Sequence, residues 1–114
     1  VHRLPITPLM QRLIDDVSTG DVVFPDANGR ALATNQLGKY LRVNHPDICK
    51  FTAHDLRRTV ATHLRDLGYL NMEIGMLLNH SGTGITDIYA RGRPMQRLET
   101  MLNDWHSRLN ELIN

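Results

Sequence analysis

Cysteine and long apolar runs are nearly missing from this chain of 114 residues, and each shortage argues against a class of protein. The single cysteine, Cys49, cannot form an internal disulfide and favours a reducing compartment such as the cytoplasm. No apolar run approaches the length of a membrane span, and no basic-then-apolar leader opens the sequence. We therefore expect one cytoplasmic domain that is large enough to bury a hydrophobic core.

The sequence also lacks the residue spacings that bind metals or nucleotides. It contains no His-Glu-x-x-His motif and no Cys-x-x-Cys pair, which argues against a zinc site despite the six histidines. The segment Ser81-Gly82-Thr83-Gly84 matches neither of the glycine-rich patterns that bind nucleotide phosphates. We therefore expect no metal and no cofactor.

The basic residues are unusual in kind, because eleven of the thirteen are arginine and only two are lysine. A net charge of +1 does not by itself indicate a nucleic-acid partner, but arginine is the better planar, two-point ligand for phosphate. Six of the arginines fall in two short segments: Arg57, Arg58, Arg65, Arg91, Arg93 and Arg97. The alternative is that these arginines simply pair with the twelve acidic side chains.

Hydrophobic periodicity predicts a mainly α fold with at most a small β element near the N-terminus, a strand pair between residues 1–6 and 22–24. Thr7 is the predicted N-cap of the first helix, and Asn71 can cap the fourth. A short helix is expected around Tyr89. The other helices should present apolar faces to one shared core, at residues 9–17, 37–43, 56–67 and 74–78.

The last segment, residues 95–114, has the regular spacing of an amphipathic helix. Its apolar residues step by three and four along the chain and form one seam: Met95, Leu98, Leu102, Trp105, Leu109 and Leu112. Such a seam is too apolar to remain in water. The helix could fold back onto its own chain or dock on a neighbouring copy.

Four residues in the second half of the chain carry side chains that together can act on a phosphodiester. His54 and Arg57 stand three apart in His-Asp-Leu-Arg, His80 ends Leu-Leu-Asn-His, and Tyr89 closes Ile-Thr-Asp-Ile-Tyr. Arginine binds phosphate oxygens, imidazole transfers protons, and a phenol can attack phosphorus. Residues three apart in a helix lie about 60° apart around its axis, so His54 and Arg57 can face one cleft.

Each of these residues also has a structural interpretation when it is taken alone. Helix geometry does not distinguish Arg57 from Arg58, and His80 can cap the carbonyls at a helix end. An unperturbed phenol has a pKa near 10, so a nucleophilic tyrosine needs a base and nearby cations. Of the other tyrosines, Tyr40 is predicted to lie in the core and Tyr69 in a turn.

As an ordered set, these four residues closely resemble the motifs of the tyrosine recombinase, or phage integrase, family. The resemblance covers roughly residues 1–94 and is strongest over residues 52–91. It implies the helical C-terminal part of a recombinase catalytic domain in residues 1–94, followed by the amphipathic helix of residues 95–114. It also implies site-specific recombination or integration of double-stranded DNA through a 3′-phosphotyrosyl intermediate.

The same resemblance gives each residue a role. Tyr89 matches the nucleophile and Arg57 the arginine that binds the scissile phosphate. His54 matches the histidine that assists proton transfer, and His80 the one that hydrogen-bonds the phosphate. Neighbouring arginines are expected to contact DNA: Arg58, Arg91 and Arg93. Self-association in the recombination complex is expected through the last helix: Met95, Leu98, Leu102, Trp105 and Leu109.

The sequence also departs from the family pattern. No residue here matches the family's first catalytic arginine or its catalytic lysine, since Lys39 and Lys50 lie past the expected position. Asn79 stands where the family commonly has glycine. We therefore expect part of a phage or mobile-element integrase that is inactive alone. The alternatives are a non-catalytic helical DNA-binding module and a structural piece built around the last helix.

Overall fold

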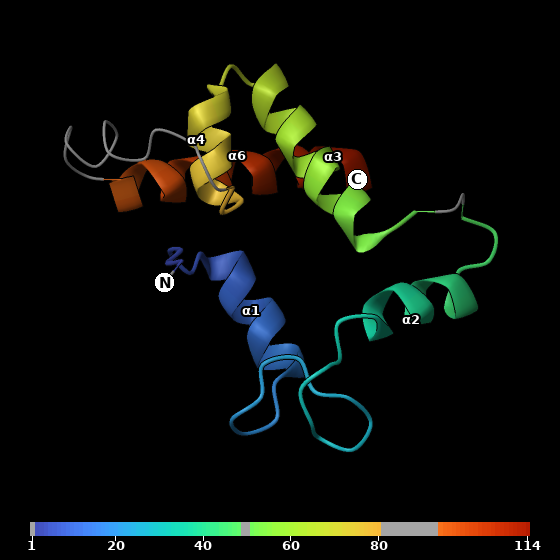
Figure 1. Ribbon diagram of the computed structural model, residues 1–114. Helices are drawn as coiled ribbons and strands as arrows, with labels where there is room; N and C mark the ends of the chain where they lie inside the picture. Colours follow the sequence, from blue (N-terminus) through green and yellow to red (C-terminus); the bar gives the residue numbers. More distant parts are fainter. Residues whose placement is uncertain (1, 49–50, 81–93) are drawn as a thin grey trace. The chain divides into compact units, whose positions relative to one another are not determined.

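The structure, a computed structural model, describes residues 2–48, 51–80 and 94–114. This part of the chain contains five helices (Figure 1): α1 (Pro8–Val17), α2 (Gln36–Asn44), α3 (Ala53–Asp66), α4 (Asn71–Leu77) and α6 (Pro94–Ile113). The mainly α prediction is confirmed. In the described residues, β structure is limited to two isolated bridges, Thr19 with Val22 and Pro25 with Ala31. Neither 2–6 nor 22–24 forms a strand in the described part of the chain, and Pro5 lacks the N–H that a ladder requires.

Helix α3 begins at a reciprocal cap that the sequence encodes. The Asp55 carboxylate accepts a hydrogen bond from the Thr52 N–H at 2.8 Å, and Thr52 Oγ1 accepts one from the Asp55 N–H at 3.3 Å. This arrangement satisfies two N–H groups that lack partners within the helix. It fixes the first turn of α3, which carries His54.

The other end of α3 buries Tyr69. Gly68 has a φ of 93°, which glycine adopts without a steric penalty, and the Tyr69 N–H bonds to the Leu64 carbonyl at 3.1 Å. In this C-cap motif, the residue after the glycine often packs on the last turn, and both Tyr69 and Leu64 are buried. Tyr69 thus follows the glycine that ends α3, as expected for a turn residue, but its burial was not predicted.

Helix α4 starts one position away from the predicted cap. Leu70 is the N-cap residue, and the Glu73 carboxylate accepts a hydrogen bond from its N–H at 2.8 Å. Asn71 is the first residue of the helix, and its side-chain oxygen accepts a hydrogen bond from Arg65 Nε at 3.1 Å. Glu73 thus performs the capping that the sequence suggested for Asn71.

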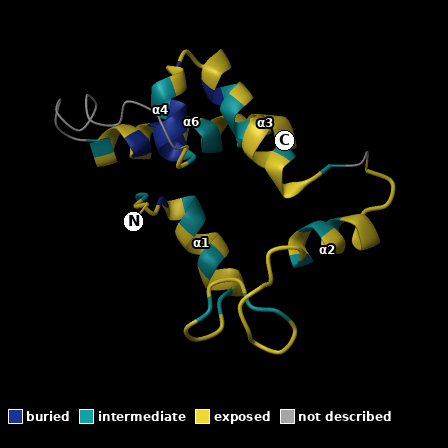
Figure 2. Cartoon of the chain, viewed as in Figure 1, coloured by how far each residue is buried: buried dark blue, intermediate teal, exposed yellow. Residues whose placement is uncertain are grey.

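The chain forms two compact units, residues 1–7 with 57–114 and residues 8–56. All the buried hydrophobic residues of the described part belong to the first unit (Figure 2): Leu64, Tyr69, Ile74, Met76, Leu77, Leu98, Met101 and Leu102. They come from α3 and its C-terminal end, from α4 and from the first half of α6. The segments that carry Arg57 and His80 therefore rest on a packed core.

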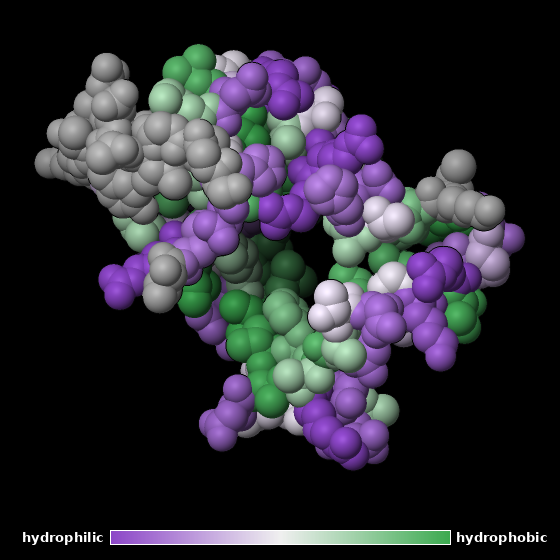
Figure 3. Space-filling view, viewed as in Figure 1, coloured by the Kyte–Doolittle hydropathy of each residue, from purple (hydrophilic) through white to green (hydrophobic). Residues whose placement is uncertain are grey.

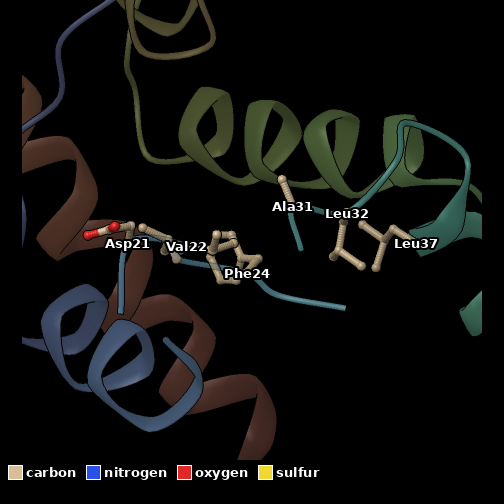
Figure 4. A pocket seen from close by; sticks show the side chains of 7 residues that line it. Asp21, Val22, Phe24, Ala31, Leu32 and Leu37 are labelled. Atoms are coloured by element: carbon tan, nitrogen blue, oxygen red, sulfur yellow. The ribbon is translucent and has the colours of Figure 1, made fainter. Parts of the chain in front are cut away.

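The second unit, with α1 and α2, leaves its apolar face uncovered. Neither helix buries a residue, and apolar side chains line an open groove of about 800 Å³ that includes Phe24, Leu37 and Tyr40. A pocket of about 670 Å³ shares Phe24 and Leu37 (Figure 4), and hydrophobic side chains gather over α1 and the segment after it (Figure 3). Within this unit the apolar faces of α1 and α2 form no packed core of their own, because periodicity identifies an apolar face but not what covers it. A core shared with the other helices stays a prediction. Tyr40, predicted to lie in the core, is 57% exposed.

Helix α6 packs within its own unit. Leu98, Met101 and Leu102 are buried, and the Trp105 ring lies 5.5 Å from the His63 ring of α3, centroid to centroid. Because Leu98 and Leu102 are already buried within the chain, the structure gives no support to the self-association expected through this seam. Among the described residues, no helix combines the length and apolarity of a membrane span.

His106 joins the N-terminal segment to α6 and should make stability depend on pH. Its Nδ1 lies 3.3 Å from Oγ1 of Thr7, which is buried. Burial lowers the pKa of His106. The unfolded chain, in which histidine has a pKa of about 6.5, therefore binds this proton more readily than the folded chain. Stability should fall as the pH drops below about 6.5.

Urea unfolding at a series of pH values between about 7.5 and 5 checks this expectation. The His106→Gln variant should lose less stability on acidification than the wild type, because it removes the group that gains a proton on unfolding. His45 is exposed, so His45→Gln should retain the wild-type slope. A His106→Gln slope equal to that of the wild type would contradict the assignment.

Candidate active site

Arg57 is held against the end of α4 by a main-chain oxygen. It projects from α3 and donates a hydrogen bond from Nη2 to the Leu78 carbonyl. Leu78 is the C-cap of α4. Carbonyls at a helix C-terminus lack partners within the helix and form the negative end of its dipole. A guanidinium supplies both a donor and a positive charge, and its five N–H groups leave others for a second acceptor such as phosphate.

The backbone conformation at the end of α4 fixes the position of the His80 main chain. Asn79 adopts a left-handed conformation with a φ of 56°. The His80 N–H bonds to the Gly75 carbonyl at 2.8 Å, and the Asn79 N–H bonds to the Met76 carbonyl at 3.3 Å. These are the two bonds of the C-cap motif that also ends α3. Glycine adopts this conformation most readily, and asparagine is the next most common residue type in it. Asn79 can therefore take the place of the glycine that the family commonly has.

Together, these hydrogen bonds attach the Arg57 guanidinium to the chain just before His80. Arg57 is bonded to Leu78, and His80 follows two residues later. Arg57 and His80 are both exposed, so solvent and a ligand can reach them. An arginine fork with a nearby imidazole can bind a phosphate group and exchange a proton with it.

The remaining predicted site residues are placed less completely. His54 is exposed in the first turn of α3, three residues before Arg57, and the boundary between the two units falls after Leu56. Arg58 is exposed on α3, and its carbonyl accepts a hydrogen bond from Thr62 Oγ1 at 2.9 Å. Three predicted residues lie outside the described part of the chain: Tyr89, Arg91 and Arg93.

A polar cluster that the sequence analysis missed joins the end of α3 to α4 and α6. Arg97 Nε lies 2.6 Å from a Glu73 carboxylate oxygen, and the guanidinium lies 4.7 Å from the centroid of the Tyr69 ring. The Tyr69 hydroxyl donates a hydrogen bond to Asp104. The capping pattern Leu70-x-x-Glu73 and the seven-residue spacing of Arg97 and Asp104 were the available signals.

Electrostatics within this cluster stabilise its protonation states. Burial and the Asp104 hydrogen bond raise the pKa of Tyr69 to about 12, so its phenol remains protonated near neutral pH. Burial alone would raise the pKa of Glu73, but hydrogen bonds from Arg97 and the Leu70 N–H outweigh it and lower that pKa. The described residues contain no group of three or more His, Cys, Asp or Glu side chains that could hold a metal.

Comparison with known proteins decides the family. Residues 3–95 match the phage integrase family, which is more than half of the chain. This chain belongs to the phage integrase family. It is 32% identical over 94 residues to the tyrosine recombinase XerD of Vibrio cholerae serotype O1. The match covers 79% of this chain but 31% of that relative. No solved structure matches the chain.

The family commonly has glycine at the position of Asn79, which fits the positive φ observed there. This conformation predicts how substitutions of Asn79 change the stability of the fold. Asn79→Gly should leave stability almost unchanged, because glycine accepts a positive φ. Asn79→Ala should cost about 1–2 kcal/mol, because an alanine side chain clashes in this conformation. Urea unfolding of both variants checks the difference. Asn103 is exposed and helical in α6, so Asn103→Ala should be neutral or slightly stabilising. An Asn79→Ala variant as stable as the wild type would contradict the left-handed conformation of Asn79.

Proposed function

We propose that the protein carrying this chain performs site-specific recombination of double-stranded DNA with Tyr89 as the nucleophile. The observation that best supports this proposal is the hydrogen bond from the Arg57 guanidinium to the carbonyl of Leu78, two residues before His80, in a member of the integrase family. A cation held in advance at a site of developing negative charge is what phosphoryl transfer requires.

The proposed reaction is a transesterification. The Tyr89 oxygen forms a bond to phosphorus as the bond from phosphorus to the 5′ oxygen breaks. The phenol gives its proton to a base, and the leaving 5′ oxygen gains one to become a hydroxyl. The product is a 3′-phosphotyrosyl bond, which the hydroxyl of another DNA strand later attacks. This exchange conserves the energy of the phosphodiester.

The other residues take roles that fit their chemistry. Arg57 stabilises the negative charge on the phosphate oxygens, and His80 hydrogen-bonds the same group. His54 assists proton transfer. Further arginines bind the flanking backbone phosphates and set the salt dependence of DNA binding: Arg58, Arg91 and Arg93.

We also propose that the complete enzyme is a phage or mobile-element integrase that acts in the cytoplasm of a bacterial host cell. The chain spans 31% of the length of its relative. Its residues include no match to the family's first catalytic arginine or its lysine. The 114 residues alone should therefore cleave little or no DNA, because losing one donor to the reacting centre typically costs about 10²–10³ in rate.

The test is to trap and map the covalent intermediate. The full-length protein is incubated with a DNA substrate nicked close to the cleavage site, so that the released fragment diffuses away and the intermediate accumulates. Denaturing electrophoresis and mass spectrometry should show a phosphotyrosyl peptide that contains Tyr89. A protein that shifts DNA in a native gel but forms no adduct would instead be the DNA-binding module.

A further inference from the structure

The cluster of Tyr69, Glu73, Arg97 and Asp104 includes a residue in the first turn of α6, the helix that follows the segment carrying Tyr89 in the sequence. Pro94 is the first residue of α6, and Arg97 lies in its first turn. Glu73 lies in α4, whose end is followed by His80. The ion pair of Arg97 with Glu73 therefore connects the two helices that border residues 81–93.

The geometry of the pair is well defined from both sides. One Glu73 oxygen lies 2.6 Å from Arg97 Nε, and the other accepts the Leu70 N–H at 2.8 Å, so both carboxylate oxygens have partners. The Glu73 side chain is only 14% exposed, whereas the Arg97 side chain is 50% exposed. The Tyr69 ring beneath the guanidinium restricts Arg97 further. The carboxylate is thus the fixed partner, and the arginine is the movable one.

Stability alone does not explain this arrangement. A partly exposed ion pair contributes little to folding, and buried apolar residues already hold α6 in place, among them Leu98 and Met101. What the pair adds is a fixed register between the first turn of α6 and α4. We propose that Glu73 and Arg97 are positioning residues, which set the attachment point of the Tyr89 segment relative to the phosphate site at Arg57 and His80.

This inference rests on the proposed function, because it gives the ion pair a purpose only if Tyr89 attacks a phosphate. The physical reason is the sensitivity of covalent attack to distance. A misplacement of about 1 Å, even one caused by a change far from the chemistry, can cost about 10²-fold in rate. Residues that set such a distance should affect the rate of the bound complex and leave DNA affinity unchanged.

The variants separate the ion pair from the cap and from DNA contact. Glu73→Gln retains an oxygen for the Leu70 N–H but removes the charge that Arg97 binds. Arg97→Gln removes the cation, and Arg97→Lys retains it without the planar fork. Arg108→Gln is the matched control. Arg108 forms an ion pair with Glu111 at 3.0 Å, and both residues lie near the C-terminal end of α6.

The measurements are the rate of adduct formation at saturating DNA, DNA affinity, and thermal melting, all on the full-length protein. Glu73→Gln and Arg97→Gln should react about 10- to 100-fold more slowly at saturation, with unchanged affinity. Arg97→Lys should fall between them and the wild type, and Arg108→Gln should match the wild type. Melting should shift by only a few degrees, and assays run below the lowest melting temperature exclude unfolding.

Three outcomes would overturn the inference. An unchanged rate in Glu73→Gln would show that the ion pair has no positioning role. A loss confined to Arg97→Gln and expressed as weaker DNA affinity would make Arg97 a phosphate contact. A wild-type protein that forms no Tyr89 adduct would remove the proposed function itself, and this failure is distinguishable because it appears before any variant is compared.

Discussion

Replacing Tyr89 with phenylalanine should abolish the covalent adduct between protein and DNA. Phenylalanine has no oxygen with which to attack phosphorus, and no other group can form the phosphotyrosyl bond at that position. DNA binding should persist, because the ring and the arginines that are close to Tyr89 in the sequence remain. Full-length protein and a nicked trapping substrate should therefore give a shifted band in a native gel and no band that survives denaturation.

The two other tyrosines are the controls for this experiment. Tyr40 is 57% exposed in the second unit, and Tyr40→Phe should form adduct at the wild-type rate. Tyr69→Phe should also form adduct, because the Tyr69 phenol is buried and its pKa of about 12 keeps it protonated. An adduct that survives in Tyr89→Phe and disappears in Tyr40→Phe or Tyr69→Phe would show that the nucleophile was wrongly assigned.

The sequence predicted those elements whose signals are local. The apolar face predicted at residues 56–67 belongs to helix α3, which extends over Ala53–Asp66, because the apolar stripe and the glycine that follows it, Gly68, are close together in the sequence. The first helix begins at Pro8, directly after the predicted N-cap residue Thr7. Such signals involve neighbouring residues only, so they can be recognised before any packing is known.

The failures arose where a residue's environment depends on distant parts of the chain. Tyr40 was assigned to the core from its helix face, yet no residue of α2 is buried. Tyr69 does follow the glycine that ends α3, but its contacts with Asp104 and Arg97, about thirty residues later, were not predicted. Periodicity states which face of a helix is apolar. It does not state which later segment packs on that face.

The candidate site shows the same division. Family motifs selected Arg57, but the contact of its guanidinium with the Leu78 carbonyl could not be read from the spacing of the two residues. The left-handed conformation of Asn79 was also unpredicted, although the resemblance to a glycine-containing motif was a signal for it. Both the Arg57 hydrogen bond and the Asn79 conformation depend on the backbone path at the end of α4. Hydrophobic periodicity does not predict that path.

Replacing Arg57 should reduce the rate of adduct formation by about 10²–10³ at saturating DNA. Arg57→Gln removes the charge that stabilises the phosphate as negative charge develops, and it leaves the Leu78 carbonyl with a weaker donor. Arg57→Lys retains a charge but not the planar fork, so its rate should lie between those of the wild type and Arg57→Gln. Single-turnover kinetics on the nicked substrate measure this effect directly.

Arg58 provides the matched comparison, because it is the next residue on α3 and lies about 100° around the helix from Arg57. If Arg58 contacts a backbone phosphate, Arg58→Gln should weaken DNA binding and reduce the slope of log affinity against log salt by about one. Its rate at saturating DNA should stay close to that of the wild type. The opposite pattern, with the rate lost in Arg58→Gln and retained in Arg57→Gln, would reverse the assignment of the two arginines. Both side chains are exposed on one helix, and the assignment of Arg57 to the reacting phosphate rests on its hydrogen bond to the Leu78 carbonyl at the end of α4.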